Sequence, residues 1–282
     1  MISDSSFERP EGWAGAGFSA MTPGGTELDR PRPGGLEVLR CLERRDERLL
    51  GVWEGATGRL RCLLERAADA RWTNDGAALV TVTEEVMVRI LEWPALKVLN
   101  SARLDFDTRR GVAGLDLVLS AAGDMGIVRL WSGQSEEGLA IFSLPDLRTV
   151  ACLAYVVGES ASLPVFSPDG RYVVHVLEPF AIWWIGDGEV ATDEEPAVGG
   201  RVQWATIHVH DLRQPVRHDE YPVFVEVPKG WLPSEDVRGA SWPRAVRFTE
   251  VGRLAFDVPW GGTCVTPVPP LGSCDAPPPR KR

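Results

Sequence analysis

Three histidines have the residue type and spacing to act together in chemistry. His208 and His210 are separated by one residue in an apolar run that predicts a strand, so both imidazoles should point to the same face of that strand. We expect His175 on the neighbouring strand. Three imidazole nitrogens at one face could hold a zinc ion and leave a coordination position open for water. The alternative is a set of surface or hydrogen-bonded histidines without a metal.

Motifs of other catalytic classes do not occur in the sequence. There is no G-x-S-x-G nucleophile motif, and Ser167 belongs to a repeated turn described below. The Gly-rich segment 123–126 lacks the lysine and the following helix of a phosphate-binding loop. The sequence therefore predicts no catalytic residue and no cofactor, and it favours a protein that is not an enzyme. A small metal-dependent hydrolase or a ligand sensor, using a pocket near the three histidines, is the alternative.

The cysteines bear on metal binding and on the cellular compartment. They are widely spaced and form no C-x-x-C pair, which argues against a thiolate zinc site. An odd number of scattered cysteines is typical of a reducing compartment, where each behaves as a small hydrophobic residue. We therefore expect a cytoplasmic protein. The five positions are Cys41, Cys62, Cys152, Cys264 and Cys274.

The composition indicates a globular, acidic chain. Of the 282 residues, 44% are hydrophobic and 25% are charged, with a net charge of −10. An acidic surface repels phosphate backbones, so we expect a protein partner rather than a nucleic acid. No stretch reaches the length of a membrane-spanning helix and none resembles a signal peptide. Arginine greatly outnumbers lysine, a bias that suggests a bacterial genome of high GC content.

The positioning elements predicted by the sequence are short strands. Apolar runs alternate with turn signals along most of the chain. Glycine and proline are dense in residues 1–35, which we expect to be an irregular leader, and residues 269–282 form a Pro-rich basic tail. Residues 36–50 fit either a helix or strands. The predicted strands are 78–83, 86–93, 96–104, 115–121, 127–131, 139–142, 148–157, 172–177, 202–210, 223–227 and 253–258.

One short turn pattern recurs three times. It consists of an aromatic residue, Ser or Thr, two variable residues and Gly, followed at once by an apolar strand. The pattern suits a β-hairpin, because the hydroxyl and a nearby Asp or Asn hydrogen-bond the turn and Gly adopts a positive φ. The copies occupy residues 72–76 (W-T-N-D-G), 166–170 (F-S-P-D-G) and 248–252 (F-T-E-V-G).

These segments resemble the WD40 family of β-propellers. Residues 117–132 read L-V-L-S-A-A-G-D-M-G-I-V-R-L-W-S, which is similar to the second and third strands of a WD40 blade, with Ser132 in place of the closing Asp. Residues 166–174 read F-S-P-D-G-R-Y-V-V, a form that WD40 and TolB-like propellers share at the first turn of a blade. The Gly-His and Trp-Asp pairs of regular WD40 blades are missing, so the resemblance implies divergent blades.

The resemblance implies an all-β fold: an irregular propeller of about five four-stranded blades over residues 36–268. A strand from the N-terminal segment would complete the last blade and remove an exposed edge. The expected blade starts are near Leu36, Ala68, Gly111, Ser162 and Pro243.

Two long loops of the expected propeller carry the candidate partner-binding residues. We expect these loops at 186–200 and 228–243, and long loops on a rigid frame often bind partners. Their tryptophans either pack inside the protein or contact a partner. The candidates, including the acidic flank, are Trp183, Trp184, Asp193, Glu194, Glu195, Trp231 and Trp242. The sequence thus favours a non-catalytic platform for protein–protein interaction, an accessory or scaffold subunit of a bacterial multi-protein system.

Overall fold

The computed structural model is built from strands and turns. It describes residues 6–14, 16–19, 29–44, 47–105, 114–131, 136–156, 162–177, 183–185, 190–191, 201–212, 218–226, 244–250, 252–258 and 261–268. Within these ranges there is no α-helix, and therefore none long and apolar enough to span a membrane. The chain divides into two compact units, Met1–Tyr155 and Val156–Arg282.

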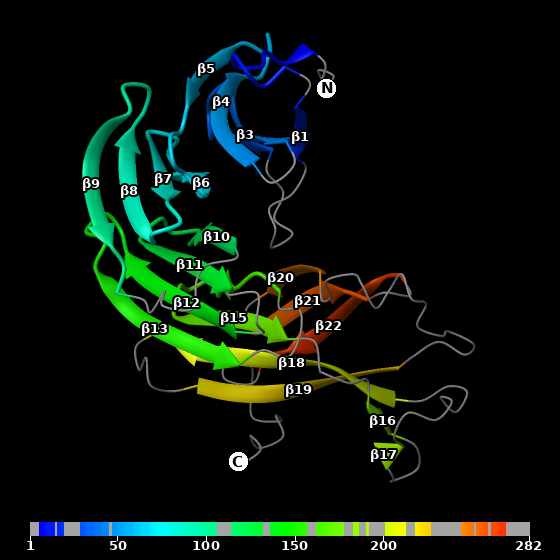
Figure 1. The fold of residues 1–282 in the computed structure, drawn as a ribbon. Helices are drawn as coiled ribbons and strands as arrows, with labels where there is room; N and C mark the ends of the chain where they lie inside the picture. Colours follow the sequence, from blue (N-terminus) through cyan, green and yellow to red (C-terminus); the bar gives the residue numbers. More distant parts are fainter. Residues whose placement is uncertain are drawn as a thin grey trace. The chain divides into compact units, whose positions relative to one another are not determined.

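The first unit contains three antiparallel sheets in chain order (Figure 1). In the first sheet, two short N-terminal strands both pair with one edge of the first long strand. The remaining two strands follow in chain order on the other side of that long strand. Its strands are β1 (Gly17–Ser19), β2 (Arg30–Pro31), β3 (Glu37–Arg44), β4 (Glu47–Glu54) and β5 (Leu60–Leu63). The second sheet is β6 (Asp69–Trp72), β7 (Ala78–Val82), β8 (Met87–Glu92) and β9 (Lys97–Arg103). The third is β10 (Gly114–Leu119), β11 (Met125–Trp131), β12 (Glu136–Ser143) and β13 (Thr149–Val156).

Both faces of the middle sheet are buried, which accounts for its apolar sequence. All five residues of β7 are buried. Leu79 packs in a cluster with residues of the first sheet, such as Leu39 and Val52. Val80 on the opposite face packs with Leu117 and other residues of the third sheet. A strand that is covered on both sides reads as a continuous run of apolar and β-branched residues rather than as an alternation.

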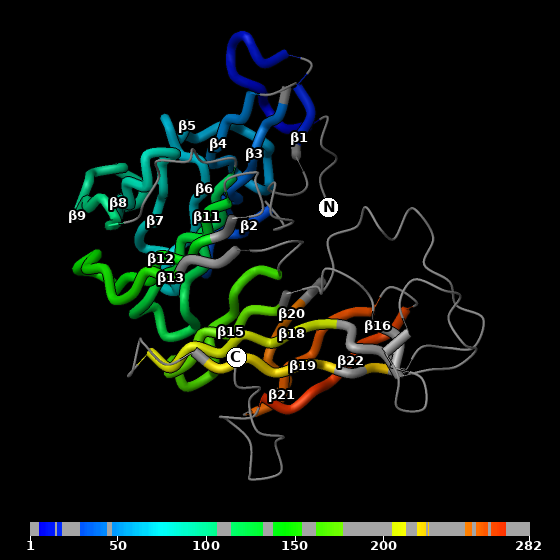
Figure 2. Tube along the Cα trace, turned by 60° about the horizontal axis from the view of Figure 1, so that its bottom comes forward, coloured from blue at the N-terminus to red at the C-terminus, as the bar shows by residue number. Residues whose placement is uncertain are grey.

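The second unit contains two further sheets (Figure 2). Its larger sheet is formed by β14 (Val165–Phe166), β15 (Tyr172–Leu177), β16 (Trp183–Ile185), β17 (Val190–Ala191), β18 (Arg201–Asp211) and β19 (His218–Glu226). The smaller one is β20 (Arg244–Glu250), β21 (Arg253–Asp257) and β22 (Thr263–Pro267). One apolar cluster holds the two together, and it includes Ile207 and Val223 from the larger sheet and Phe256 from the smaller.

Two of the three predicted turns form with the expected hydrogen bonds, whereas in the third copy Phe248–Glu250 belong to a strand that ends at Glu250. In the first copy, the Thr73 hydroxyl donates to Asp75 at 2.6 Å and accepts the Ala78 N–H at 3.0 Å, and Gly76 has a φ of +67°. In the second copy, Ser167 donates to Asp169 at 2.5 Å and accepts the Tyr172 N–H at 2.9 Å. Side-chain oxygens thus close both hairpins.

A further copy of this turn lies in the third sheet. The Ser120 hydroxyl accepts the Met125 N–H at 3.1 Å and donates to Asp124 at 2.8 Å, and Gly123 has a φ of +76°. Leu119 stands where the other copies have an aromatic residue, so this copy departs from the sequence pattern although its hydrogen bonds are the same.

A second kind of turn occurs once in the second sheet and once in the third. Residues 93–96 (W-P-A-L) join β8 to β9, and residues 144–147 (L-P-D-L) join β12 to β13. Both contain a cis X-Pro bond, and both end in a leucine with positive φ, +53° at Leu96 and +56° at Leu147. The second and third sheets therefore have two kinds of turn in common. The hydroxyl-closed turn joins the first two strands of each sheet, and the cis-proline turn joins the last two.

The all-β prediction is confirmed, and four of the five sheets begin close to the expected positions, whereas the first begins at Gly17 rather than near Leu36. β6, β10, β14 and β20 start at Asp69, Gly114, Val165 and Arg244. Residues 36–50 form strands rather than a helix. The expectation of a wholly irregular leader over 1–35 is wrong, because β1 and β2 lie in it and pair with the edge of β3. The N-terminal strand thus completes the first sheet, not the last as expected. The tail, 269–282, lies outside the described residues.

Candidate functional site

A buried acid, Asp69, joins one strand from each of the three sheets in the first unit. Its side chain is fully buried at the start of β6. Arg30 of β2 approaches one carboxylate oxygen at 2.6 Å, and the Leu117 N–H of β10 donates to the other at 2.7 Å. Burial raises the pKa of the Asp69 carboxyl, and the Arg30 guanidinium opposes that rise.

Further polar contacts extend this junction. The Arg30 guanidinium also donates to the Ala70 carbonyl, and the Arg30 carbonyl accepts the indole N–H of Trp72 at 3.1 Å. Arg71 donates to the Leu117 carbonyl at 2.6 Å. These bonds satisfy buried polar groups by linking one sheet to the next. We assign the junction a structural role, because its polar atoms bond to the frame itself.

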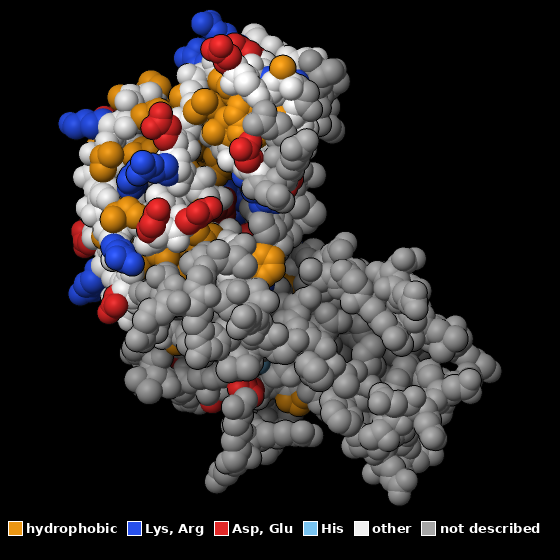
Figure 3. All heavy atoms as spheres, viewed as in Figure 1, with side chains coloured by type: hydrophobic (Ala, Val, Ile, Leu, Met, Phe, Trp, Pro, Cys, Tyr) orange, Lys and Arg blue, Asp and Glu red, His pale blue; other side chains and the backbone are white. Residues whose placement is uncertain are grey.

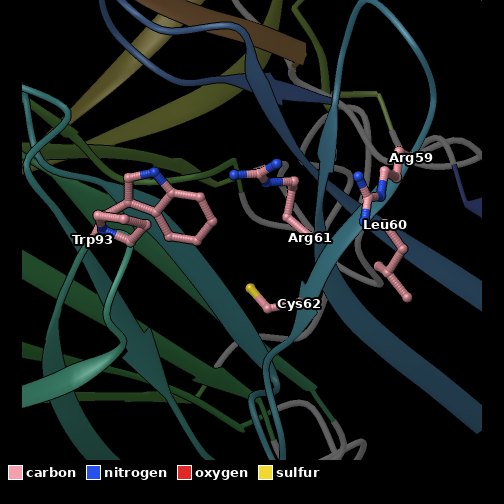
Figure 4. A pocket seen from close by; sticks show the side chains of 6 residues that line it. Arg59, Leu60, Arg61, Cys62 and Trp93 are labelled. Carbon is pink, nitrogen blue, oxygen red and sulfur yellow. The ribbon is translucent and has the colours of Figure 1, made fainter.

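A surface pocket of about 230 Å³ lies between the first and second sheets of this unit. Two arginines, an indole ring, a thiol and two further apolar side chains line it. Figure 4 shows the Arg61 guanidinium extending toward Trp93, with the Cys62 sulfur directed to the space beside them. Arg59 and Leu60 lie on the side of Arg61 away from Trp93. The lining residues are Arg59, Leu60, Arg61, Cys62, Trp93 and Pro94.

A β-bulge positions Arg61 at this pocket. In the register of β4 with β5, Val52 pairs with Cys62 and Trp53 pairs with Leu60, so Arg61 is an extra residue without a counterpart. A bulge interrupts the alternation of faces and redirects a side chain. Accordingly Cys62 packs with the cluster shared with the second sheet, whereas Leu60 packs on the opposite face.

Trp93 supplies the apolar wall of the pocket and is held firmly. Its ring meets that of Trp72 edge to face, with centroids 5.3 Å apart. Its backbone N–H donates to the Ala77 carbonyl at 2.9 Å. The indole is 8% exposed, so a bound group would meet its rim. Such an aromatic wall is placed in advance of binding.

The thiol of the pocket is a neutral group. Burial raises the pKa of Cys62 to about 11, although the nearby Arg61 lowers it slightly. The thiolate, not the thiol, is the nucleophilic form of cysteine. At neutral pH Cys62 is therefore a wall of the pocket, and its chemistry is that of a small apolar side chain.

The two pocket arginines differ from several arginines of their unit that are paired with carboxylates. Both are exposed, and within the described ranges neither forms an ion pair. Other arginines of the unit have carboxylate partners, as in the pairs Arg30–Asp69, Arg32–Glu37, Arg40–Asp29, Arg48–Glu43 and Arg129–Asp116. On the face seen in Figure 3, cationic, acidic and apolar side chains of this unit lie interspersed. The pocket is thus a local cationic spot on an acidic chain.

The structure brings the predicted histidines onto one face of the larger sheet of the second unit. His175 of β15 lies directly opposite His208 of β18, with ring centroids 5.8 Å apart. His210 follows on the same face, and all three are buried. Nδ1 of His208 is 3.8 Å from a Glu220 oxygen, beyond hydrogen-bonding distance. In the part of the chain that the structure describes, no group of three or more His, Cys, Asp or Glu is placed to hold a metal ion.

The predicted partner-binding residues mostly lie beyond the described ranges. Trp183 and Trp184 are on β16, whose backbone pairs with β17 and β18. Asp193, Glu194, Glu195, Trp231 and Trp242 are outside the described residues. Their proposed role therefore stays a prediction.

Sequence reasoning missed the arginine–tryptophan pocket. Pro94 marked the end of a strand, and this signal could have drawn attention to Trp93. The bulge at Arg61 leaves no signature in the run L-R-C-L, because it arises from pairing with β4. In comparisons with known proteins, no family model matches the chain, and no curated protein matches it.

Proposed function

We propose that the five sheets are the blades of an irregular β-propeller. Each sheet follows the previous one along the chain, and the strands within the first three are joined mainly by short hairpins. In the first unit, β2 at the N-terminal edge of the first sheet and the leading strands β6 and β10 of the next two approach one another around Asp69. The leading strands of propeller blades line the central channel, so this clustering supports the proposal.

On this frame, we propose a non-catalytic platform for protein–protein interaction. The observation that carries the proposal is the pocket of Arg59, Arg61 and Trp93. Arginine and tryptophan are the residue types most enriched where binding energy concentrates in protein interfaces. The pocket offers cations, an aromatic rim and a protonated thiol, which suit recognition better than bond-breaking chemistry. We further propose that the chain is a cytoplasmic accessory subunit of a bacterial multi-protein system.

The proposal predicts a complex of defined stoichiometry. The tagged chain, expressed at native level in its source cell, should elute in size-exclusion chromatography with another protein at a constant molar ratio. An unrelated protein of similar pI, prepared in the same way, controls for nonspecific association. Elution of the chain alone in repeated native preparations would contradict the proposal. Stoichiometric zinc, iron or manganese in the purified chain, lost on His208→Ala, would instead support the metal-dependent alternative.

A further inference from the structure

We propose that the pocket of Arg59, Arg61 and Trp93 binds an acidic side chain presented by an extended segment of a partner protein. The inference rests on the proposed function and specifies the chemistry of the partner. Three properties of the pocket lead to it: its size, its charge and its place at a sheet edge.

The size of the pocket excludes most free small molecules as its main ligand. Sites for drug-sized ligands and cofactors enclose about 300–1,000 Å³, whereas this pocket has about 230 Å³. A space of this size suits one side chain. Most of the binding energy must then come from contacts outside the pocket, which a polypeptide can make and a metabolite cannot.

The charge of the pocket selects an acid. Arg59 and Arg61 stand on either side of Leu60 without carboxylate partners among the described residues. A guanidinium offers paired N–H donors that match the geometry of a carboxylate. The chain as a whole carries a net charge of −10, so an acidic segment would be repelled elsewhere and directed to this spot.

The edge of the sheet gives the segment its direction. β5 is the last strand of its sheet in the described part of the chain. The Leu60 N–H is already bonded to the Glu8 carboxylate at 2.8 Å, so an incoming segment would align with the residues that follow. Edge strands accept extended peptides through backbone hydrogen bonds. The bulge at Arg61 limits this pairing to a short stretch, which leaves specificity to the pocket.

A nucleic acid fits the pocket less well than a peptide. Two arginines neutralise only about two phosphates, which gives weak binding at physiological salt. The net charge of −10 on the chain would oppose the remaining phosphates. A carboxylate segment, by contrast, needs only one or two charges placed at the pocket.

Fluorescence anisotropy with labelled peptides on the full chain tests the inference. The probe is the fluorescein-labelled peptide G-E-V-E-V-E-V-E-G, and its counterpart has lysine in place of every glutamate. We expect saturable binding of the acidic peptide only. Loss of one charged hydrogen-bond partner costs about 1.5–3 kcal/mol, so Arg61→Glu should weaken binding roughly tenfold or more. Arg61→Lys should give an intermediate affinity, because lysine keeps the positive charge but lacks the paired N–H donors of the guanidinium.

The control is Arg103→Glu, an equal change of charge at an exposed position of β9 outside the pocket. It should alter affinity by less than about twofold, because Arg103 is at the opposite end of β9 from Pro94 and salt screens the interaction of exposed charges. Thermal unfolding of each variant verifies that the fold is intact.

Four outcomes would overturn the inference: no saturable binding of the acidic peptide, equal binding of the basic peptide, equal losses for Arg61→Glu and Arg103→Glu, or tighter binding of an oligo-dT strand. A native partner that still co-elutes with an Arg59→Glu, Arg61→Glu double variant would overturn this inference alone. The proposed function would survive that result, because the partner would bind at another surface.

Discussion

Asp69 is a fully buried acid at the junction of three sheets. Its carboxylate accepts bonds from Arg30 on β2, from Leu117 on β10 and from the neighbouring Ala70 N–H. A single side chain thereby connects three sheets whose sequences are far apart. Removing it leaves the Arg30 cation in a low-dielectric site without a counter-charge.

Asp69→Asn should therefore destabilise the protein by about 3–5 kcal/mol, the usual cost of breaking a buried ion pair. Urea denaturation would measure the loss. Glu43→Gln is the matched control, because the Glu43–Arg48 pair lies at the surface and such pairs contribute about 0–1 kcal/mol. Equal effects of the two variants would show that the junction does not stabilise the fold.

The buried thiols predict a distinctive pH dependence of alkylation. Burial raises the pKa of both Cys41 and Cys62 to about 11, so both remain neutral and slow to react at pH 8. Cys152 is exposed and should react first among the cysteines that the structure describes. The rate at Cys62 should rise about tenfold per pH unit up to its pKa, following the thiolate fraction. Mass spectrometry after timed iodoacetamide treatment measures each site, and rapid labelling of Cys62 at pH 8 would contradict the prediction.

Within the elements, hydroxyl groups close the first hairpins of three sheets. Ser120→Ala and Ser167→Ala each remove the acceptor of a backbone N–H, so each should cost about 1–3 kcal/mol. The exposed Thr249 of the third predicted copy provides the comparison. Its change to Ala should fall within about 0.5 kcal/mol, as is usual for surface sites. Thermal denaturation would rank the variants, and a loss at Thr249 equal to the others would contradict the assignment.

A close approach of backbone and ring depends on Gly126 in β11. A Cβ there would lie 2.2 Å from the ring of Phe142, which is fully buried. Gly126→Ala should thus destabilise the protein by about 1–3 kcal/mol through overpacking. Gly17→Ala, in a strand with open space around it, should be neutral or slightly stabilising. Chemical denaturation of the two variants measures the difference in their free energies of unfolding.

The strands were largely predictable from sequence because their signals are local. The run 78–83 begins directly after a Gly of the turn pattern, and β7 occupies Ala78–Val82. Where the local signal changed, only the repeat was missed: the hairpin turn between residues 115–121 and 127–131 was predicted, but Leu119 replaces the aromatic residue before Ser120, so the turn was not assigned to the repeated pattern. The short strands β1 and β2 were missed for a different reason, since Gly- and Pro-rich residues pair there only because β3 offers an edge.

The pocket was beyond sequence prediction for a similar physical reason. Arg61 and Trp93 belong to different sheets, and a bulge set by β4 places the first of them. The histidines were easier, because a spacing of two on a strand fixes a common face. The structure places His175 beside His208 as the sequence predicted.

At the scale of the whole molecule, acidity governs solution behaviour. The sequence pI is about 5.0 and the net charge at neutral pH is −10. Solubility should be lowest near pH 5, where self-repulsion vanishes, and should rise toward pH 8. Light scattering across this range measures the minimum. A solubility minimum near pH 7 would show that the net charge of the folded protein differs from the formal net charge of its sequence.

The order of the sheets along the chain has a consequence for synthesis on the ribosome. Each sheet of the first unit is made from neighbouring segments, and its hairpins close over a few residues. Contacts between residues close in sequence form early and quickly. Asp69 meets both Arg30 and the Leu117 N–H once residues up to about β10 have emerged. The nascent polypeptide can therefore lock its first sheets together before the histidine-bearing strands have been translated.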